Sequence, residues 1–256
     1  MLEEALEVAI EAAKFAGKSS LEVFDTLELF SVQKKQDIIR EKEITLEREI
    51  RRRLAERFPD HHIVGEEEGT VGDEQSACTW YIDPIDGTGN FSRGIPQYGV
   101  SVALADHDRI VMGVIYQPVR EQLFTATIED VARMNGNPIR VSQRHWLSES
   151  DIYYTDNIGT HAPELLAKIV QSLRAKTLAL HSVSCTSYDL SLVALGKADG
   201  LLKWAEHPWG FAAAGLIVEK AGGKLTDEKG AEWTVKTERL VVSNGLLHDE
   251  LMPYLR

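Results

Sequence analysis

The segment that most constrains this chain is residues 80–91, with the sequence WYIDPIDGTGNF. It joins an apolar run, typical of a strand, to two carboxylates three residues apart. In an unbroken strand, residues i and i+3 point to opposite faces of the sheet. Pro84 restricts its own φ and keeps Asp83 out of the helical region, which favours a turn. After that turn, Asp83 and Asp86 can both face one pocket at the end of the strand.

The residues that follow Asp86 suit an anion. Gly87 and Gly89 let the backbone come close to a ligand. If Thr88 begins a helix, the free N–H groups there face the same pocket and suit a phosphate. Because carboxylates hold hard cations, the segment predicts a metal-assisted phosphate site. The alternative is an ordinary acidic turn, since Asp-Pro and Asp-Gly are common turn dipeptides.

A second acidic segment supports the prediction of a metal site. Residues 65–69, with the sequence GEEEG, follow a short apolar run at 63–64 and so form a second strand end that carries acids. Mg²⁺ takes a few carboxylates together with water and substrate phosphate. Within this segment, Glu68 is expected in a solvated loop outside the site.

Together these segments resemble the inositol monophosphatase family of Mg²⁺-dependent, lithium-sensitive sugar phosphatases, over nearly the whole chain. The resemblance is carried by GEE at 65–67, by WYIDPIDGTGNF, by NGNPIRVS at 135–142, by ADG at 198–200 and by AGG at 221–223. It implies an α/β (α+β) fold, a layered αβαβα sandwich of the inositol monophosphatase and fructose-1,6-bisphosphatase type. It also implies a homodimer.

The resemblance implies a set of metal ligands with two or three Mg²⁺ ions. Glu66, Asp83 and the carbonyl of Ile85 would hold one ion, and Asp86 would be shared toward a second. In two-metal catalysis the ions activate the nucleophile, neutralise phosphoryl oxygens and stabilise the leaving alkoxide.

The resemblance also implies roles for the residues around the phosphate. The phosphate would lie on the backbone N–H groups of Gly87 and Thr88. A water would be deprotonated with help from Thr88 and the upstream acid Glu43, and would attack phosphorus in line, with no covalent enzyme intermediate. Glu43 stands where the family has an aspartate, and Arg40 stands where it has a threonine.

The largest departure from the family pattern is Gly210. The family has Trp-Asp where this chain has Trp209-Gly210, and that aspartate is a ligand of the second metal. Glycine supplies no side-chain oxygen, so the second metal site is expected to be weakened; Glu206 or Asp189 could replace the ligand only through a shifted loop. Gly210 therefore supports an alternative, a non-catalytic or metal-impaired member of the family that acts as a binding or regulatory protein.

Two further residues bear on the substrate. Lys203 stands where inositol-preferring members carry a glutamate that binds sugar hydroxyls. It is either an ordinary exposed lysine or a determinant of preference for a more anionic substrate, such as a sugar bisphosphate. His207 precedes the helix that faces the site and either contacts substrate or caps and packs that helix. Inositol monophosphate, fructose 1,6-bisphosphate and histidinol phosphate all remain candidate substrates.

Periodicity predicts one α/β unit with two halves, residues 1–142 and 143–256, and the site between them. Expected helices span 2–24, 44–58, 162–173, 188–195 and 209–221. Expected strands lie at 79–83, 98–105, 109–117, 122–126, 152–154, 178–182, 200–204 and 239–243, with the second and third in a hairpin. His61 and His62 are expected in a loop.

Composition and motifs exclude several rival functions. A net charge of −12 argues against nucleic acid or an anionic membrane as the main partner. Cys78 and Cys185 are too few for a disulfide framework. With an acidic opening and no apolar run near the length of a membrane span, a cytoplasmic enzyme is expected. Asp83 and Asp86 lie three residues apart, whereas the two catalytic acids of a haloacid-dehalogenase-type phosphatase lie two residues apart, so that class is excluded. Neither a P-loop motif nor a dinucleotide-binding motif occurs in the sequence.

Overall fold

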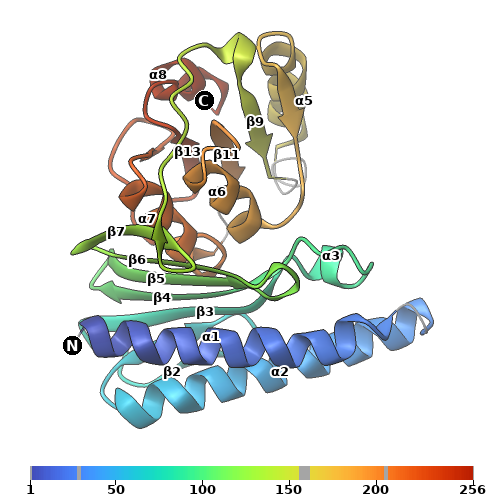
Figure 1. Ribbon diagram of the computed structural model, residues 1–256, viewed down its shortest axis with the longest axis vertical. Helices are drawn as coiled ribbons and strands as arrows, with labels where there is room; N and C mark the ends of the chain where they lie inside the picture. Colours follow the sequence, from blue (N-terminus) through green and yellow to red (C-terminus); the bar gives the residue numbers. More distant parts are fainter. Residues whose placement is uncertain (1, 28–29, 156–161, 205–206, 256) are drawn as a thin grey trace.

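The computed structural model describes residues 2–27, 30–155, 162–204 and 207–255. It has five layers, shown in Figure 1: two helices, an eight-stranded sheet, two helices, a five-stranded sheet and an outer helical layer. The layered αβαβα sandwich expected from the family resemblance is therefore confirmed. None of the helices in the described part of the chain combines the length and apolar character needed to cross a bilayer.

The helices are α1 (Leu2–Phe24), α2 (Val32–Arg57), α3 (Thr88–Phe91), α5 (Pro163–Arg174), α6 (Thr186–Ala194), α7 (Ala212–Lys220) and α8 (His248–Leu251). The first sheet contains β1 (His62–Gly65), β2 (Gly69–Val71), β3 (Cys78–Asp86), β4 (Gly99–Asp106), β5 (Arg109–Gln117), β6 (Gln122–Thr127), β7 (Asp130–Met134) and β8 (Asn137–Pro138). The second contains β9 (Asp151–Tyr154), β10 (Ala179–His181), β11 (Gly200–Trp204), β12 (Lys224–Asp227) and β13 (Arg239–Ser243).

The eight-stranded sheet has the order β2-β1-β3-β4-β5-β6-β7-β8 and is antiparallel except where β1 pairs with β3. The five-stranded sheet has the order β10-β9-β11-β13-β12, with β9 parallel to both its neighbours. Because β1 and β3 run in parallel, their carboxyl ends meet at the same edge of the sheet, as the site prediction requires. The predicted hairpin of β4 and β5 is confirmed.

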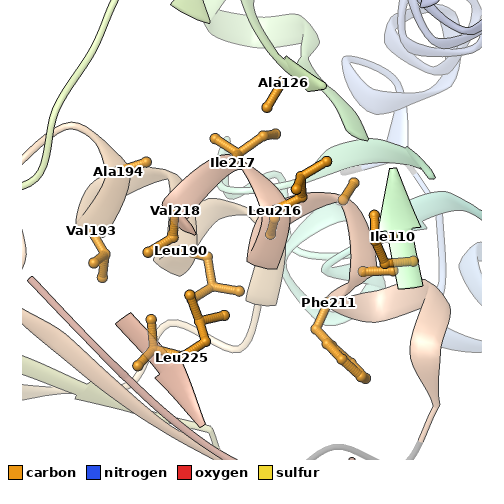
Figure 2. Close-up of a cluster of buried hydrophobic side chains, with 14 of the residues drawn as sticks. Ile110, Ala126, Leu190, Val193, Ala194, Phe211, Leu216, Ile217, Val218 and Leu225 are labelled. Atoms are coloured by element: carbon orange, nitrogen blue, oxygen red, sulfur yellow. The ribbon is translucent and has the colours of Figure 1, made fainter. Parts of the chain in front are cut away.

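Small residues let the helices lie close to the first sheet. On α1 a stripe of buried alanines faces the sheet: Ala5, Ala9, Ala12, Ala13 and Ala16. On the other face, α7 lies so near β5 that a Cβ at Gly113 would be 2.7 Å from the carbonyl oxygen of Ala213. Figure 2 shows this central layer, where side chains of α6 and α7 pack between the two sheets around Leu190, Leu216 and Ile217.

The structure corrects several boundaries. The second helix begins at Val32, not at residue 44, because the buried Ile39 extends its apolar stripe by two turns and the polar residues between are good helix formers. The helix expected at 209–221 is a 3₁₀ turn, Pro208–Gly210, followed by α7. His62 lies in β1 and not in a loop. Strands β2, β7, β8 and β12 were not expected, since they are short or polar.

Candidate active site

A β-bulge, rather than the predicted turn, brings Asp83 and Asp86 to one side of β3. Asp83 pairs with Ser101 of β4, and Asp86 pairs with Gly99. Between these two pairs β3 advances by three residues while β4 advances by two. The extra residue reverses the alternation of side chains, which puts i and i+3 on the same face. Proline suits a bulge because the missing N–H removes no regular ladder bond there. The strand consequently continues through Pro84 to Asp86.

The carboxyl group of Glu66, an exposed residue, is in hydrogen-bond contact with the carboxyl group of Asp83, which is buried. Glu66 follows β1, and its N–H donates to the carbonyl of Ile82, the residue before Asp83. Partial desolvation of its carboxyl group raises the pKa of Glu66 to about 7; the hydrogen bond with Asp83 opposes this shift, and the charges of Asp86 and Glu67 add to it. Burial, then the Glu66 and Asp86 charges, raise the pKa of Asp83 well above its usual value. Two such groups can share a proton or a cation.

Thr88 and Glu43 also meet, although 45 residues separate them. The Thr88 hydroxyl lies 2.8 Å from Oε1 of Glu43 and 3.1 Å from the carbonyl oxygen of Ile85. Burial raises the pKa of Glu43 to about 7; the Thr88 hydrogen bond opposes this shift, and the Glu66 charge adds to it. The threonine hydroxyl and the acid assigned to it thus lie in one hydrogen-bonded group beside the carboxyl pair.

Gly87 shapes the loop between Asp86 and Thr88. Its φ of 93° lies in the left-handed region, and a Cβ there would be 3.0 Å from the Gln97 carbonyl oxygen and from Cβ of Cys185. Only glycine meets both conditions without strain. The expected helix at Thr88 does form, but α3 has only four residues.

Asp86 points to a different element. Its Oδ2 accepts a hydrogen bond from the backbone N–H of Ser187 near the start of α6, and the Cys185 thiol lies 3.4 Å from the same oxygen. Across the described ranges, no three side chains of His, Cys, Asp or Glu converge in an arrangement that could hold a metal ion. The structure therefore brings Glu66 and Asp83 into contact and leaves Asp86 tied to α6.

Lys203 is buried, which removes the alternative that it is an ordinary exposed lysine. It is 6% exposed, and its Nζ donates to Oγ1 of Thr186 at 2.9 Å. Thr186 adjoins Ser187, so consecutive residues of α6 bind Lys203 and Asp86. Since β11 carries Lys203, the start of α6 links the second sheet to the end of β3.

The remaining predicted residues lie around the 3₁₀ turn before α7. His207 is exposed and stacks on Trp209, with ring centroids 4.3 Å apart. Gly210 ends the turn, and a Cβ there would meet no atom within 4 Å, so a larger side chain has room. Of the two proposed substitutes for a missing ligand, Asp189 is fully buried in α6, and Glu206 lies outside the described residues.

Sequence reasoning missed the polar groups that hold the site from behind. The start of α6, with Cys185, Thr186 and Ser187, carried no motif. On α2, Glu47 and Arg51 continue the face of Glu43 at i+4 and i+8. The spacing of four residues could have indicated that Glu47 and Arg51 lie on the same side of the helix as Glu43. It does not stand out, because the helix has many other charged residues. Glu68, expected outside the site, is bound by Arg48 at the surface.

Comparisons with known proteins identify the family of the chain and support its fold. A family model described as the inositol monophosphatase family matches residues 1–256. The chain is 32% identical to the Nus factor SuhB of Pseudomonas aeruginosa, covering 93% of this chain and 91% of that one. It is 31% identical to a fructose-1,6-bisphosphatase/inositol-1-monophosphatase of Thermotoga maritima, covering 87% and 85%. The structure of inositol monophosphatase from Anabaena superposes with a TM-score of 0.88 at 29% identity, covering 99% and 96%.

Proposed function

The chain belongs to the inositol monophosphatase family, and we propose that it is a Mg²⁺-dependent phosphomonoesterase acting on a small sugar or polyol phosphate. The family is generally metal-dependent, and its members hydrolyse phosphoric monoesters. The observation that carries the proposal is the contact of the Glu66 carboxyl group with the buried Asp83 carboxyl group, beside the Thr88–Glu43 hydrogen bond.

The chemistry of these groups fits a hard divalent cation. Two acids in contact repel each other when both are charged, and a cation between them relieves that repulsion. Their oxygens and the nearby carbonyl of Ile85 are the donor type that Mg²⁺ prefers. Glu66, Asp83 and Ile85 would hold the first ion, and Asp86 would be shared toward a second. When bound, the ion would act as a Lewis acid and lower the pKa of water.

The chain's own residues would position the phosphate and move the proton. The N–H groups of Gly87 and Thr88 would bind phosphoryl oxygens. The Thr88 hydroxyl, held by Glu43, would orient a water for in-line attack. Glu43 would accept the proton of that water, since burial raises its pKa to about 7. The new bond joins the water oxygen to phosphorus, the bond from phosphorus to the sugar oxygen breaks, and the sugar leaves as an alkoxide that takes a proton from solvent water.

Lys203 supports a more anionic substrate, such as a sugar bisphosphate. Its ammonium is buried and is held next to the α6 residue that binds Asp86. A buried cation near the phosphate site would attract a second phosphate, and the Thermotoga maritima relative is named as a bisphosphatase as well as a monophosphatase. His207, exposed and stacked on Trp209, would contact the substrate. We further propose a cytoplasmic homodimer.

A second candidate function is a binding or regulatory role. Gly210 lacks the family's metal-binding carboxylate, and one relative is named a Nus factor. The test that separates the two functions is release of phosphate from inositol monophosphate and fructose 1,6-bisphosphate as Mg²⁺ is raised. Turnover that requires Mg²⁺ supports the enzyme. A folded protein that binds the sugar phosphates but releases none would favour the binding role.

A further inference from the structure

A buried glutamate on α2 holds the turn that carries Glu66. Oε2 of Glu47 accepts the N–H of Glu67 at 2.8 Å, and Oε1 accepts the N–H of Glu68 at 3.0 Å. The Glu47 side chain is fully buried. The turn lies directly on it, since a Cβ at Gly65 would be 2.4 Å from the Glu47 carboxyl carbon.

Arg51 holds the other end of the same turn. Its Nε donates to Oε1 of Glu47 at 2.9 Å, and its Nη2 donates to the carbonyl of Gly69 at 2.6 Å. The guanidinium therefore neutralises the buried carboxylate and fixes the last residue of the turn. Removing one partner of a buried pair leaves an uncompensated charge, so each of the two groups depends on the other.

The same face of α2 also reaches the second loop of the site. Glu43, Glu47 and Arg51 follow one another at intervals of four residues, which places them on one side of a helix. Glu43 contacts Thr88, while Glu47 and Arg51 contact the turn of Glu66. One rigid helix thus sets the position of the first metal ligand relative to the threonine hydroxyl.

We propose that Glu47, together with Arg51, is a positioning residue that fixes Glu66 against Asp83 and so sets the affinity of the site for a divalent cation. It acts through the backbone of residues 65–69 and contacts neither substrate nor metal. The inference rests on the proposed function, because Glu66 is assigned there as a metal ligand. Groups that orient ligands from behind typically contribute about 10–100-fold to metal affinity.

The test is Mn²⁺ binding to the full chain, measured by the electron paramagnetic resonance signal of the free ion. In Glu47→Gln the amide oxygen can accept only one of the two N–H groups, and Arg51 loses its counter-charge. The dissociation constant for Mn²⁺ should rise about 10–100-fold. The control is Glu49→Gln, the same change two residues away, where the glutamate binds Arg52 and Arg53 on the outer side of α2. Its dissociation constant should stay within about 2-fold of the unmodified protein.

Hydrogen exchange in the metal-free protein separates positioning from a general loss of stability. In Glu47→Gln the amides of Glu67 and Glu68 should exchange at least about 10-fold faster, while the amides of β4 keep their rates. If Glu47→Gln does not fold, the same two measurements are made on Glu47→Asp. That variant keeps the charge but shortens the side chain, so the same changes in Mn²⁺ affinity and amide exchange are expected.

Two results would overturn the inference. Unchanged Mn²⁺ affinity in the folded variant would remove Glu47 from metal binding. Equally faster exchange in β4 would make its role merely structural. An unmodified chain that binds no Mn²⁺ would instead overturn the proposed function, and this inference with it.

Discussion

The two sides of the candidate site differ in how completely they are built. On the side of the first sheet, Glu66 and Asp83 touch, and Thr88 is bonded to Glu43. On the side of the central helices, Asp86 is occupied by Ser187, and Gly210 offers no side chain. Under the proposed function, the first side would hold a cation, whereas the second side lacks the carboxylate that the family has at residue 210. The difference teaches that the proposed first metal position can keep its side chains in this fold while the proposed second position lacks one.

The largest effect on activity is expected from a substitution on the side of the first sheet. Asp83→Asn should lower Mg²⁺-dependent phosphate release by at least about 100-fold, because loss of a direct ligand costs no less than loss of a group behind it. The metal-free variant should melt at the same temperature or higher, since one buried acid is gone. Phosphate release and thermal unfolding check both points. Undiminished turnover would show that the pair holds no catalytic metal.

Breaking the hydroxyl of Thr88 should have the next largest effect. Thr88→Ala should reduce kcat about 100-fold, as expected when a group that orients a proton transfer is lost, while Thr88→Ser keeps the hydroxyl and most of the rate. The Glu43 contact explains the difference between the two variants. Steady-state kinetics at saturating Mg²⁺ make the comparison. Equal kcat values for the two variants would show that the Thr88 hydroxyl has no role in catalysis.

A smaller effect is expected on the incomplete side, at Lys203. Lys203→Gln keeps a hydrogen-bond donor for Thr186 but removes the charge. It should shift the ratio of kcat/KM for fructose 1,6-bisphosphate over inositol monophosphate about 10-fold toward the monophosphate, the scale of one lost charge pair. Lys203→Glu should shift the ratio further. A ratio that stays the same in both variants would exclude Lys203 from substrate choice.

The smallest expected effect is the pH dependence of stability without metal. Glu66 and Glu43 have pKa values raised from 4.5 to about 7 on folding. An acid whose pKa is raised on folding binds more protons in the folded than in the unfolded protein. Its contribution to the stability of the folded protein is therefore present below its unfolded pKa and is lost as pH rises through about 7. The melting temperature in a chelator should fall by roughly 5–10 °C between about pH 5 and about pH 8.

Added Mg²⁺ should recover most of that loss at the higher pH and little at the lower pH, where the acids are protonated. Differential scanning calorimetry with and without Mg²⁺ gives both curves. Equal stabilisation by Mg²⁺ at the two pH values would separate these acids from the metal.

Three residues of the candidate site were predictable from the chain, because they lie in one short segment that contributes to both sides. Asp83, Asp86 and Thr88 fall at a strand end, and the sequence placed them there. The route was wrong: a bulge in β3, not a turn at Pro84, brings the carboxylates to one face. The contact of Glu43 with Thr88 depended on family resemblance, since nothing local links residues 45 apart.

The supporting groups were not predictable, because burial depends on tertiary packing. Helix α2 is rich in glutamate and arginine, and the pattern does not tell which pair is buried; only the structure singles out Glu47 and Arg51. The sequence left open whether Lys203 is exposed. The structure shows that it is buried, because of the packing around β11. The division of the chain at residue 142 stays a prediction, since helices of the second half pack on the first sheet.

The most direct test of the contrast between the two sides is Mg²⁺-dependent phosphate release from this chain and from Gly210→Asp. The aspartate has room, because a Cβ at Gly210 meets nothing within 4 Å. The account predicts that the variant reaches half-maximal rate at a Mg²⁺ concentration at least about 10-fold lower than the unmodified chain. The same Mg²⁺ dependence in both proteins would contradict it, because the second side would then be complete without the aspartate.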